Sequence, residues 1–491
     1  MRNSSPVEPI IPVFKKEEIP SHWDLVSIGD ICATVDKVNP KDNPTDGFKY
    51  IDISGIDNER FMVAETKAYY GNNAPSRARQ LVREGDVVFS TVRTYLKNMA
   101  RITRELDGEV ASTGFCVLRP KEPEYSGYLF YYLQYEPFLN ELAKFQRGTS
   151  YPAVRDGDIF AQFIPVPSKP EAVRIVAEVE KQFSRLDDAV ANLKRVKANL
   201  KRYKAAVLKA AVEGKLTEEW RKQKPLDLAD GLLDKIWVEK QKYFEKQREE
   251  LAKMINSIRV PHEEAQSRPK PRKPQKATSM TEGELSELPL IPKGWCWTRL
   301  QNAILEIVVG YVGPIKEYFD EKSNIRLLST THIGENEFIN YEIRYVSRKF
   351  DIKNRKSSVS PGDILIARHG DSGKACLVPS YVEKAQVSNA VIIRPIKKLM
   401  NPLYLSYAIN ATRKELQRRR VGGLQQVVNT QSMSDFPIPI PTLDEQNEIV
   451  KEIETRLTLE KALSDQVEGD IKRANRLRQA ILNKAFVGNL A

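Results

Sequence analysis

The run SKPEAVRIVAEVEKQFSRLDDAV, residues 168–190, continues to YKAAVLKAAVEG and ends at Gly214, and the same design returns later in the chain. The second run opens TLDEQNEIVKEIETRL at Thr442 and closes LRQAILNKAFVG at Gly488, so both of its ends lie 274 residues after those of the first. Each run begins with a hydroxyl residue followed three positions later by Glu, the capping-box pattern of a helix start. Each ends on glycine, which readily takes the left-handed conformation that closes a helix.

Forty-odd residues at about 1.5 Å rise predict two helices of roughly 60–70 Å, far longer than ordinary globular helices. Apolar residues in the first run follow a seam repeating every seven residues, with one slip of phase: Val176, Val179, Phe183, Leu186, Val190, Leu193, then Val196, Leu200, Tyr203, Val207, Ala210. The second run is interrupted by polar residues, and its apolar face is expected at Leu463, Val467, Ile471, Leu477 and Ile481. Such a seam favours pairing with another helix, so we expect the two runs to form a coiled coil.

The repeat extends into the sequence before each helix. An Ile-Pro-x-x-Trp segment starts each half, at Ile19 and at Ile291. A Gly-Asp turn leading into an apolar run follows in both halves, and later an apolar strand that ends in Arg-Pro. Each half therefore reads as an α+β globular domain followed by a long helix, with turn-to-strand signals shared between the copies.

The chain accordingly divides into seven predicted segments. They are an N-terminal tail (1–18), a first globular domain (19–167), a first long helix (168–216), a charged helical connector (217–258), a flexible linker (259–288), a second globular domain (289–441) and a second long helix (442–491). The linker prediction rests on its Pro, Lys and Ser content and its lack of apolar residues.

The composition limits the classes of function that the chain can have. The chain has 491 residues, 41% of them hydrophobic and 29% charged, with a formal net charge of +12. The excess of cations favours a polyanionic partner, and the lack of a lipidation motif or amphipathic anchor favours nucleic acid over membrane. Four scattered cysteines without C-x-x-C, no signal-peptide core and no long apolar run predict a reducing cytoplasm, no zinc site and no disulfide scaffold.

Motifs for catalysis are missing. The stretch from His369 to Ala375 resembles a phosphate-binding loop but lacks both its leading glycine and its final hydroxyl residue. No G-x-G-x-x-G follows a strand, no amino-methyltransferase Asn-Pro-Pro-Tyr occurs, and no Ser, Cys or His has a catalytic neighbourhood. We therefore expect neither an active site nor a metal site in this chain.

Polar, aromatic and basic residues do gather at predicted loops, where they could contact DNA. Arg suits guanine and Gln or Asn suits adenine in the major groove, while Lys holds phosphates without reading sequence. The candidate DNA-binding residues are Arg77, Arg79, Arg93, Tyr95, Lys97, Arg147, Thr149, Ser150, Tyr151, Arg155, Thr330, His332, Arg368, His369, Lys374, Arg418, Arg419, Gln425, Gln426 and Asn429.

In order and spacing the chain resembles the specificity subunits of Type I restriction–modification systems. The features that carry the resemblance are the two-domain, two-helix repeat, the Ile-Pro-x-x-Trp starts, the Ile-Pro-x-Pro lead into each helix, and the run from Glu213 through Thr217 to Arg221. It covers nearly the whole chain except the N-terminal tail.

The resemblance implies two target-recognition domains, each reading one half of a bipartite, asymmetric DNA target. It implies an antiparallel coiled coil that acts as a spacer, two methyltransferase subunits along the helices, and restriction–translocation subunits joined to them. A subunit of this kind catalyses nothing, so S-adenosylmethionine, Mg and ATP would belong to the partner subunits.

Two alternatives stay open. A coiled-coil scaffold that binds nucleic acid without reading its sequence would discriminate little between DNA sequences. A fused nuclease or methyltransferase would act on DNA by itself, and the missing motifs argue against it.

Overall fold

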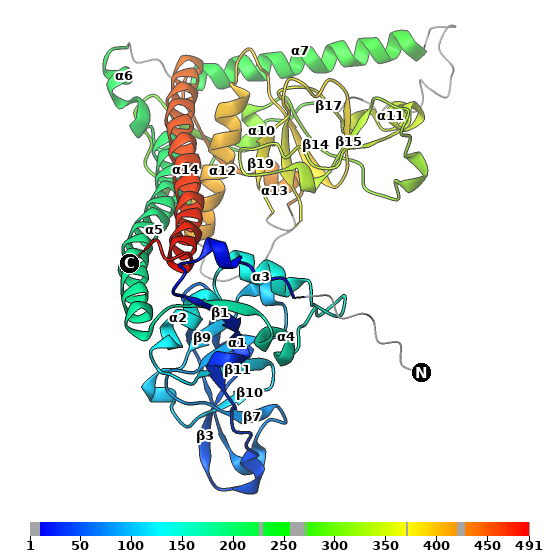
Figure 1. Cartoon of the computed structure of the whole chain (residues 1–491). Helices are drawn as coiled ribbons and strands as arrows, with labels where there is room; N and C mark the ends of the chain where they lie inside the picture. The colour runs from blue at the N-terminus through cyan, green and yellow to red at the C-terminus, as the bar shows by residue number, and fades with distance from the viewer. Residues whose placement is uncertain are drawn as a thin grey trace. The chain divides into compact units, whose positions relative to one another are not determined.

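The computed structural model describes residues 10–224, 229–255, 271, 273–369, 372–419 and 428–490. The chain folds as two compact units, one of Met1–Val196 with Gln466–Ala491 and one of Lys197–Asp465. Each unit therefore contains one sheet domain, part of one long helix and part of the other (Figure 1).

The first unit contains two four-stranded sheets and a two-stranded one. Its strands are β1 (Asp24–Ser27), β2 (Cys32–Ala33), β3 (Gly47–Ile51), β6 (Lys67–Tyr70), β7 (Ala78–Leu81), β8 (Val87–Ser90), β9 (Met99–Arg101), β10 (Val110–Ser112), β11 (Phe115–Pro120) and β12 (Phe163–Val166), with β4 (Ile56–Asp57) and β5 (Met62–Val63) forming a small hairpin. The orders are β6-β3-β10-β7, β2-β11-β8-β9 and β1-β12. Among the described strands of this unit, only β3 and β10 pair in parallel. Its helices are α1 (Ile28–Ile31), α2 (Tyr125–Tyr132), α3 (Glu136–Ala143), α4 (Asp156–Phe160) and the start of α5 (Lys169–Val212).

The second unit repeats the two four-stranded sheets and the β1–β12 pair of this plan, and its described strands include no counterpart of the β4–β5 hairpin. Its strands are β13 (Cys296–Arg299), β14 (Glu306–Val309), β15 (Arg326–Leu328), β16 (Arg344–Tyr345), β17 (Ser358–Val359), β18 (Ile364–Ala367), β19 (Ala375–Leu377), β20 (Ala385–Val387), β21 (Ala390–Arg394) and β22 (Pro437–Ile440). They order as β16-β15-β20-β17, β14-β21-β18-β19 and β13-β22, again with one parallel pair, β15 with β20. The predicted duplication is therefore confirmed in sheet topology.

The helices of the second unit complete it. They are the end of α5, α6 (Glu218–Lys222), α7 (Asp230–Ile255), α9 (Glu282–Ser286), α10 (Leu300–Ala303), α11 (Arg348–Lys353), α12 (Pro402–Arg419), α13 (Thr430–Ser434) and the start of α14 (Leu443–Phe486), whose end belongs to the first unit. Helices α5 and α14 each have 44 residues. At about 1.5 Å per residue each is roughly 66 Å long, as the sequence predicts.

The two long helices pair within each unit from opposite ends. In the first unit, Val179 and Phe183 of α5 share a core with Ile481, Leu482 and Ala485 of α14. In the second, the end of α5 shares a core with the start of α14, through Val207, Leu208, Ala211, Val212, Ile449, Val450 and Ile453. The pairing is therefore antiparallel, as predicted.

The predicted seam is wrong at two positions in each long helix. Side chains placed on it are exposed: Val196 (44%), Tyr203 (42%), Leu463 (55%) and Leu477 (49%). Burial is concentrated where a helix meets a sheet domain, because there a third surface covers the apolar face. The heptad spacing alone does not distinguish a seam covered by one partner helix from one covered by two elements.

The Ile-Pro-x-x-Trp segments receive the ends of the long helices. Gly214 (φ 68°) and Gly488 (φ 74°) take the left-handed conformation expected of them. A Cβ on Gly214 would lie 2.3 Å from Cγ of Pro292, and one on Gly488 would lie 2.3 Å from Cγ of Pro20. Glycine is therefore required at both helix ends by backbone conformation and by contact.

The capping box predicted at Thr442 and Glu445, at the start of the second long helix, is only half formed. The Thr442 hydroxyl accepts from the Glu445 amide at 3.4 Å, but the Glu445 carboxylate accepts from Trp295 Nε1 at 2.8 Å and from the Thr217 hydroxyl at 2.7 Å. It also forms an ion pair with Arg221. The glutamate thus fastens the start of α14 to the segment that follows α5.

Two segments predicted to be free are partly packed. Within 1–18, Phe14 is buried and stacks on Tyr135 with ring centroids 5.6 Å apart. Within 259–288, the Ala277 amide donates to Asn302 at 2.9 Å, and Glu284 in α9 pairs with Arg299. The predicted tail and linker therefore do not hold for these residues, because isolated apolar and capping residues found partners on the adjacent domain.

Candidate nucleic-acid interface

In the first domain, two loops that are distant in sequence form one surface. They are the β8–β9 turn (91–98) and the loop before α4 (144–155). The Arg93 amide donates to Pro152 O at 2.7 Å, and the Val154 amide donates to Thr91 O at 2.9 Å. The structure therefore brings the predicted residues between Arg93 and Lys97 next to those between Arg147 and Arg155.

This surface combines aromatic rings, cations and hydroxyl groups. Tyr95 is 59% exposed and Tyr151 is 68% exposed. The Arg93 guanidinium lies 4.7 Å from the centre of the Tyr151 ring and donates to Ser150 O at 3.2 Å. Thr149 and Arg155 are exposed beside them. Rings with flanking cations offer stacking surfaces and phosphate contacts, the two interactions that nucleic acids provide most readily.

Arg147 is partly committed to the protein itself. Its guanidinium pairs with the Asp158 carboxylate at 2.5 Å, and this hydrogen bond raises the pKa of Arg147. Asp158 also accepts from the Arg155 amide at 2.7 Å. Arg147 therefore holds the loop against α4, while half of its side chain stays exposed.

Arg77 and Arg79 lie at the edge strand β7. Arg77 is exposed, and its carbonyl accepts from the Thr113 amide at 2.9 Å. Arg79 donates to Asn39 at 2.7 Å. The adjacent Gly114 carbonyl accepts from the Thr91 amide at 3.0 Å, which connects this edge to the β8–β9 turn through the β10–β11 connection.

The second domain places its candidates on the corresponding β18–β19 connection. Arg368 Nε donates to Val428 O at 3.2 Å, so this connection meets the segment before α13. His369 is exposed and Lys374 is half-buried. Asn429 is exposed, but its side chain caps α13 by accepting from the Ser432 amide at 2.8 Å. The predictions for Gln425 and Gln426, and for the side chains of Arg418 and Arg419, fall outside the described residues.

His332 lies where it cannot reach DNA without rearrangement. The residue is 3% exposed, its Nδ1 accepts from the Ser329 amide at 3.1 Å, and burial lowers the pKa of its imidazole. The neighbouring Thr330 is half-buried. The sequence placed His332 in a polar loop, and nothing in its spacing indicated that the short helix Thr330–His332 turns the ring inward.

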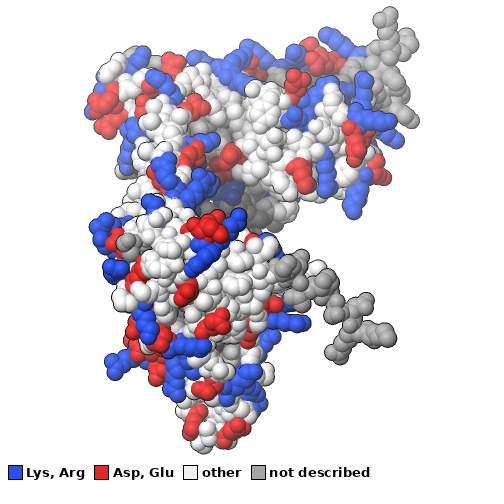
Figure 2. Space-filling view, viewed as in Figure 1, with Lys and Arg blue, Asp and Glu red and all other residues white. Residues whose placement is uncertain are grey.

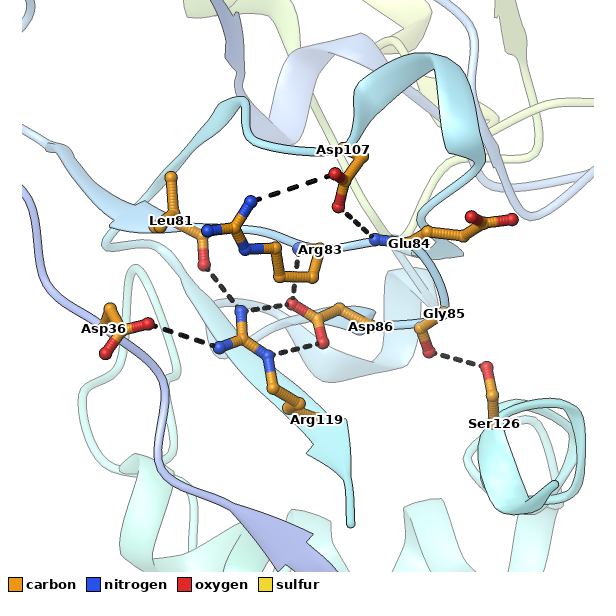
Figure 3. Close-up of polar contacts among 9 residues, drawn as sticks. All are labelled: Asp36, Leu81, Arg83, Glu84, Gly85, Asp86, Asp107, Arg119 and Ser126. Atoms are coloured by element: carbon orange, nitrogen blue, oxygen red, sulfur yellow. Dashed lines mark hydrogen bonds and ion pairs between the residues drawn. The ribbon is translucent and has the colours of Figure 1, made fainter. Parts of the chain in front are cut away.

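A buried ion pair joins Asp86, the residue before β8, to Arg119 of β11, at the end of these strands opposite the β8–β9 turn (Figure 3). Arg119, near the end of β11, donates to both carboxylate oxygens of Asp86 at 3.0 and 2.9 Å, and also to Leu81 O at 2.9 Å. Asp86 is 1% exposed and its carboxylate also accepts from the Arg83 amide at 2.8 Å. The hydrogen bond to Asp86 raises the pKa of Arg119.

The second domain repeats this pair less tightly. Asp363 lies 3.9 Å from Arg394, which pairs instead with Glu306 at 2.5 Å. The Gly-Asp and Arg-Pro segments that recur in the two halves of the sequence are thus partners in space. Sequence analysis found both segments but not their pairing.

Charge is mixed over the surface. Lys and Arg side chains lie among Asp and Glu over the face of each unit seen in Figure 2. In the described part of the chain, no group of three or more His, Cys, Asp or Glu side chains is placed to hold a metal ion. Among the same residues, no helix is long and apolar enough to cross a membrane.

Two topologically equal sheet domains, each with a polar and basic loop surface and each followed by a long helix, define a class. It is the class of duplicated nucleic-acid-recognition chains built on helical spacers. The loops of the two domains differ in sequence.

Comparison with known proteins identifies the family. The model of the Type I restriction modification DNA specificity domain matches residues 20–202 and 308–469, well over half of the chain. The chain is 23% identical over 385 residues to the EcoBI specificity subunit of Escherichia coli, covering 76% of this chain and 68% of that one. It is 21% identical over 489 residues to the EcoKI specificity subunit of E. coli K12, covering 96% and 90%.

Solved structures agree. A chain from work on complex assembly and conformational transition of the type I R-M system superposes with a TM-score of 0.69 at 25% identity, covering 96% of this chain and 99% of that one. The HsdS subunit of Thermoanaerobacter tengcongensis gives 0.53 at 25% identity, with 96% and 98% covered. The chain belongs to the family of Type I restriction–modification specificity subunits, whose domains recognise DNA.

Proposed function

We propose that this chain reads a bipartite, asymmetric DNA target, with one half-site for each globular domain. The observation that carries the proposal is a duplicated sheet topology whose loops differ. The β8–β9 turn offers Arg93, Tyr95 and Lys97, whereas the β18–β19 connection offers Arg368, His369 and Lys374. Two domains with the same sheet topology but different loops suit a DNA target that is not palindromic. Dimeric DNA-binding proteins, in contrast, bind two-fold symmetric sites.

The long helices set the distance between the half-sites in this proposal. Each is a continuous helix of 44 residues, and a helix of that length is a rigid spacer where a flexible linker would not be. Each helix ends against the Ile-Pro-x-x-Trp segment of a sheet domain, through Gly214 on Pro292 and Gly488 on Pro20. A reading domain is thereby fixed to the end of a spacer.

The same helices would carry the other subunits. The proposal includes two methyltransferase subunits bound along α5 and α14, with restriction–translocation subunits joined to them. Exposed apolar side chains support such docking: Val196, Tyr203, Leu459, Leu463 and Leu477. The chain itself would be non-catalytic, and S-adenosylmethionine, Mg and ATP would be bound by the partners.

Exchange of a single domain tests the proposal. The chain would be expressed with its methyltransferase subunit, and residues 19–167 would be replaced by the matching domain of a family member with another target. Sequencing of methylated DNA should then show a new first half-site, the old second half-site and an unchanged gap. The matched control replaces 289–441 and should change only the second half-site.

Two results would contradict the proposal. A change of both half-sites after either exchange would mean that the domains do not read independently. Methylation without any sequence motif in the unaltered complex would favour the alternative of a coiled-coil scaffold that binds DNA without reading it.

A further inference from the structure

We propose that the β8–β9 turn of the first domain is a rigid apolar wedge, and that Tyr95 and Leu96 enter a groove of duplex DNA and unstack one base step. This inference rests on the proposed function, since it names how the first domain engages its half-site. The wedge itself is residues 93–97, and the inference assigns to Leu96 and to the supporting Asn58 roles that their sequence context does not reveal.

The turn is held in an unfavourable backbone conformation. Arg93 (φ 50°, ψ 58°) and Lys97 (φ 54°, ψ 35°) both occupy the left-handed region, and they flank a single 3-10 turn of Thr94–Leu96. Non-glycine residues rarely adopt this region, and a long side chain gains nothing from it. Two such residues in one short turn persist only where the surroundings enforce them, and strained residues of this kind concentrate at functional sites.

Three hydrogen bonds from two separate segments, one around Asn58 and the other the loop before α4, enforce the conformation. Asn58 Nδ2 donates to Leu96 O at 2.9 Å, Gln146 Nε2 donates to the Thr94 hydroxyl at 2.6 Å, and the Arg93 amide donates to Pro152 O at 2.7 Å. Thr94 is 2% exposed, so it anchors the centre of the turn in the domain. The turn is therefore preorganised before any ligand binds, and little conformational freedom remains to be lost on binding.

The side chains that this turn presents to solvent are apolar. Tyr95 is 59% exposed and Leu96 is 39% exposed, directly beside each other. A turn with a purely structural role would bury these side chains or replace them with polar ones. Aromatic and aliphatic side chains on a rigid projection, with a cation on each side, suit insertion between base pairs while Arg93 and Lys97 approach phosphates.

The turn is also fixed to the spacer helix. Lys97 lies 3.5 Å from Glu136 at the start of α3, and the Glu136 amide donates to Gln479 of α14 at 2.9 Å. Tyr135 donates to Asn483 of the same helix at 2.5 Å. A wedge tied to the end of α14 would act at a defined distance along the DNA, not merely at a defined sequence.

The second domain provides an internal comparison. Its β18–β19 connection, residues 368–374, reads RHGDSGK and contains neither Tyr, Phe, Trp nor a branched aliphatic residue. The same frame therefore carries a wedge in the first domain only. Unstacking is accordingly expected in the first half-site and not in the second.

Fluorescence of 2-aminopurine reports unstacking directly. Once sequencing of methylated DNA has given the target, duplexes carrying 2-aminopurine at successive positions of both half-sites would be bound to the complex of this chain with its methyltransferase subunit. Fluorescence should rise at one step of the first half-site beyond any rise caused by the methyltransferase at its target base. The Tyr95→Ala/Leu96→Ala variant should lose that rise and bind the target roughly 5- to 100-fold more weakly.

Backbone variants separate the shape of the turn from its chemistry. At protein concentrations that saturate the duplex, Lys97→Gly should keep the rise, because glycine adopts a positive φ without strain, while the loss of the cation weakens binding. Lys97→Val should lose it, because a β-branched residue resists that conformation. Tyr95→Phe should behave as the parent, since the ring and not the hydroxyl is the inserted group.

The proposal is overturned if no position of the first half-site shows the added rise, or if Tyr95→Ala/Leu96→Ala leaves it unchanged. Tyr95 is 59% and Leu96 39% exposed, so neither side chain belongs to the buried core of the domain. Unchanged reading of the second half-site would establish that each variant is folded and assembled. Failure of the proposed function would look different, because methylated DNA would then show no bipartite motif in the parent complex.

Discussion

Replacement of Asp86 by Ala removes one member of the buried ion pair that joins the start of β8 to β11. Asp86 is 1% exposed, and the Arg119 side chain retains 18% of its exposure. In Asp86→Ala, the guanidinium keeps its bond to Leu81 O at 2.9 Å and a contact with Asp36 at 3.6 Å, but loses two charge-assisted hydrogen bonds. The Arg83 amide loses its acceptor as well.

The expected cost follows from these contacts. Removing one partner of a buried ion pair costs about 3–5 kcal/mol, because the other charge stays buried without compensation. Arg119 is not completely buried and retains Asp36, which favours the lower end. We therefore expect about 3 kcal/mol of destabilisation, which corresponds to roughly 100-fold more frequent opening of the first domain.

Hydrogen exchange measured by segment is the suitable assay, since a chain of two units has no single unfolding free energy. Amides of β8 and β11 should exchange roughly 100-fold faster in Asp86→Ala, whereas β18 and β21 should be unaffected. Asp36→Ala is the matched control: its carboxylate is 71% exposed, so its loss should cost less than about 1 kcal/mol.

The comparison with the second domain sharpens the test. Asp363→Ala should cost less in its own domain, because Asp363 lies 3.9 Å from Arg394 and Glu306 remains as that arginine's partner. The reasoning is refuted if Asp86→Ala leaves exchange in β8 within about threefold of the parent, a difference of less than 1 kcal/mol. It is equally refuted if Asp36→Ala matches Asp86→Ala.

Further outcomes follow from burial and from glycine geometry. Lys240 is 6% exposed and donates to Gln301 O at 2.7 Å, and burial lowers its pKa to about 8. Between pH 8 and the ordinary lysine pKa of 10.5 the unfolded chain binds the extra proton, so stability should rise with pH by up to about 3 kcal/mol. Thermal unfolding of Lys240→Met against the parent at pH 7.5 and 9.5 should show this rise in the parent alone, and equal slopes would disprove it. Gly488→Ala should lower the melting temperature through collision with Pro20 and a positive φ, and an unchanged value would count against that contact. Gly469→Ala, in α14 with open space around it, should raise helix stability by about 1 kcal/mol, seen as slower amide exchange there, and faster exchange would contradict it.

Local sequence patterns predicted the repeated domains and the long helices, because such patterns depend on residues that are close together in the chain. The repeat offset, the helix-ending Gly214 and Gly488, and the turn-to-strand segments all encode elements through spacing or backbone preference. The structure confirms the duplication and adds strand orders that correspond in the two domains. The antiparallel coiled coil was predicted from a seam and a resemblance, yet the seam was wrong at Val196, Tyr203 and Leu463.

Interactions between distant residues were not available to the same reasoning. Phe14 and Ala277 were predicted to lie in free segments, and both found partners on a folded domain. The imidazole of His332 points inward, and the Asn429 side chain caps the start of α13. In each case the residue type allowed two environments, and only the neighbour supplied by the fold decided between them.

The amino-acid sequence by itself determined that this protein is a duplication of an α+β domain and a long helix, because periodicity, glycine positions and turn residues act over a few residues. Only the tertiary structure decided that the Gly-Asp and Arg-Pro segments are ion-pair partners, that each long helix ends against a sheet domain, and that Arg93 and Lys97 adopt left-handed conformations around an exposed Tyr-Leu pair. Those features depend on contacts between segments tens to hundreds of residues apart, and such contacts exist only once the chain has folded.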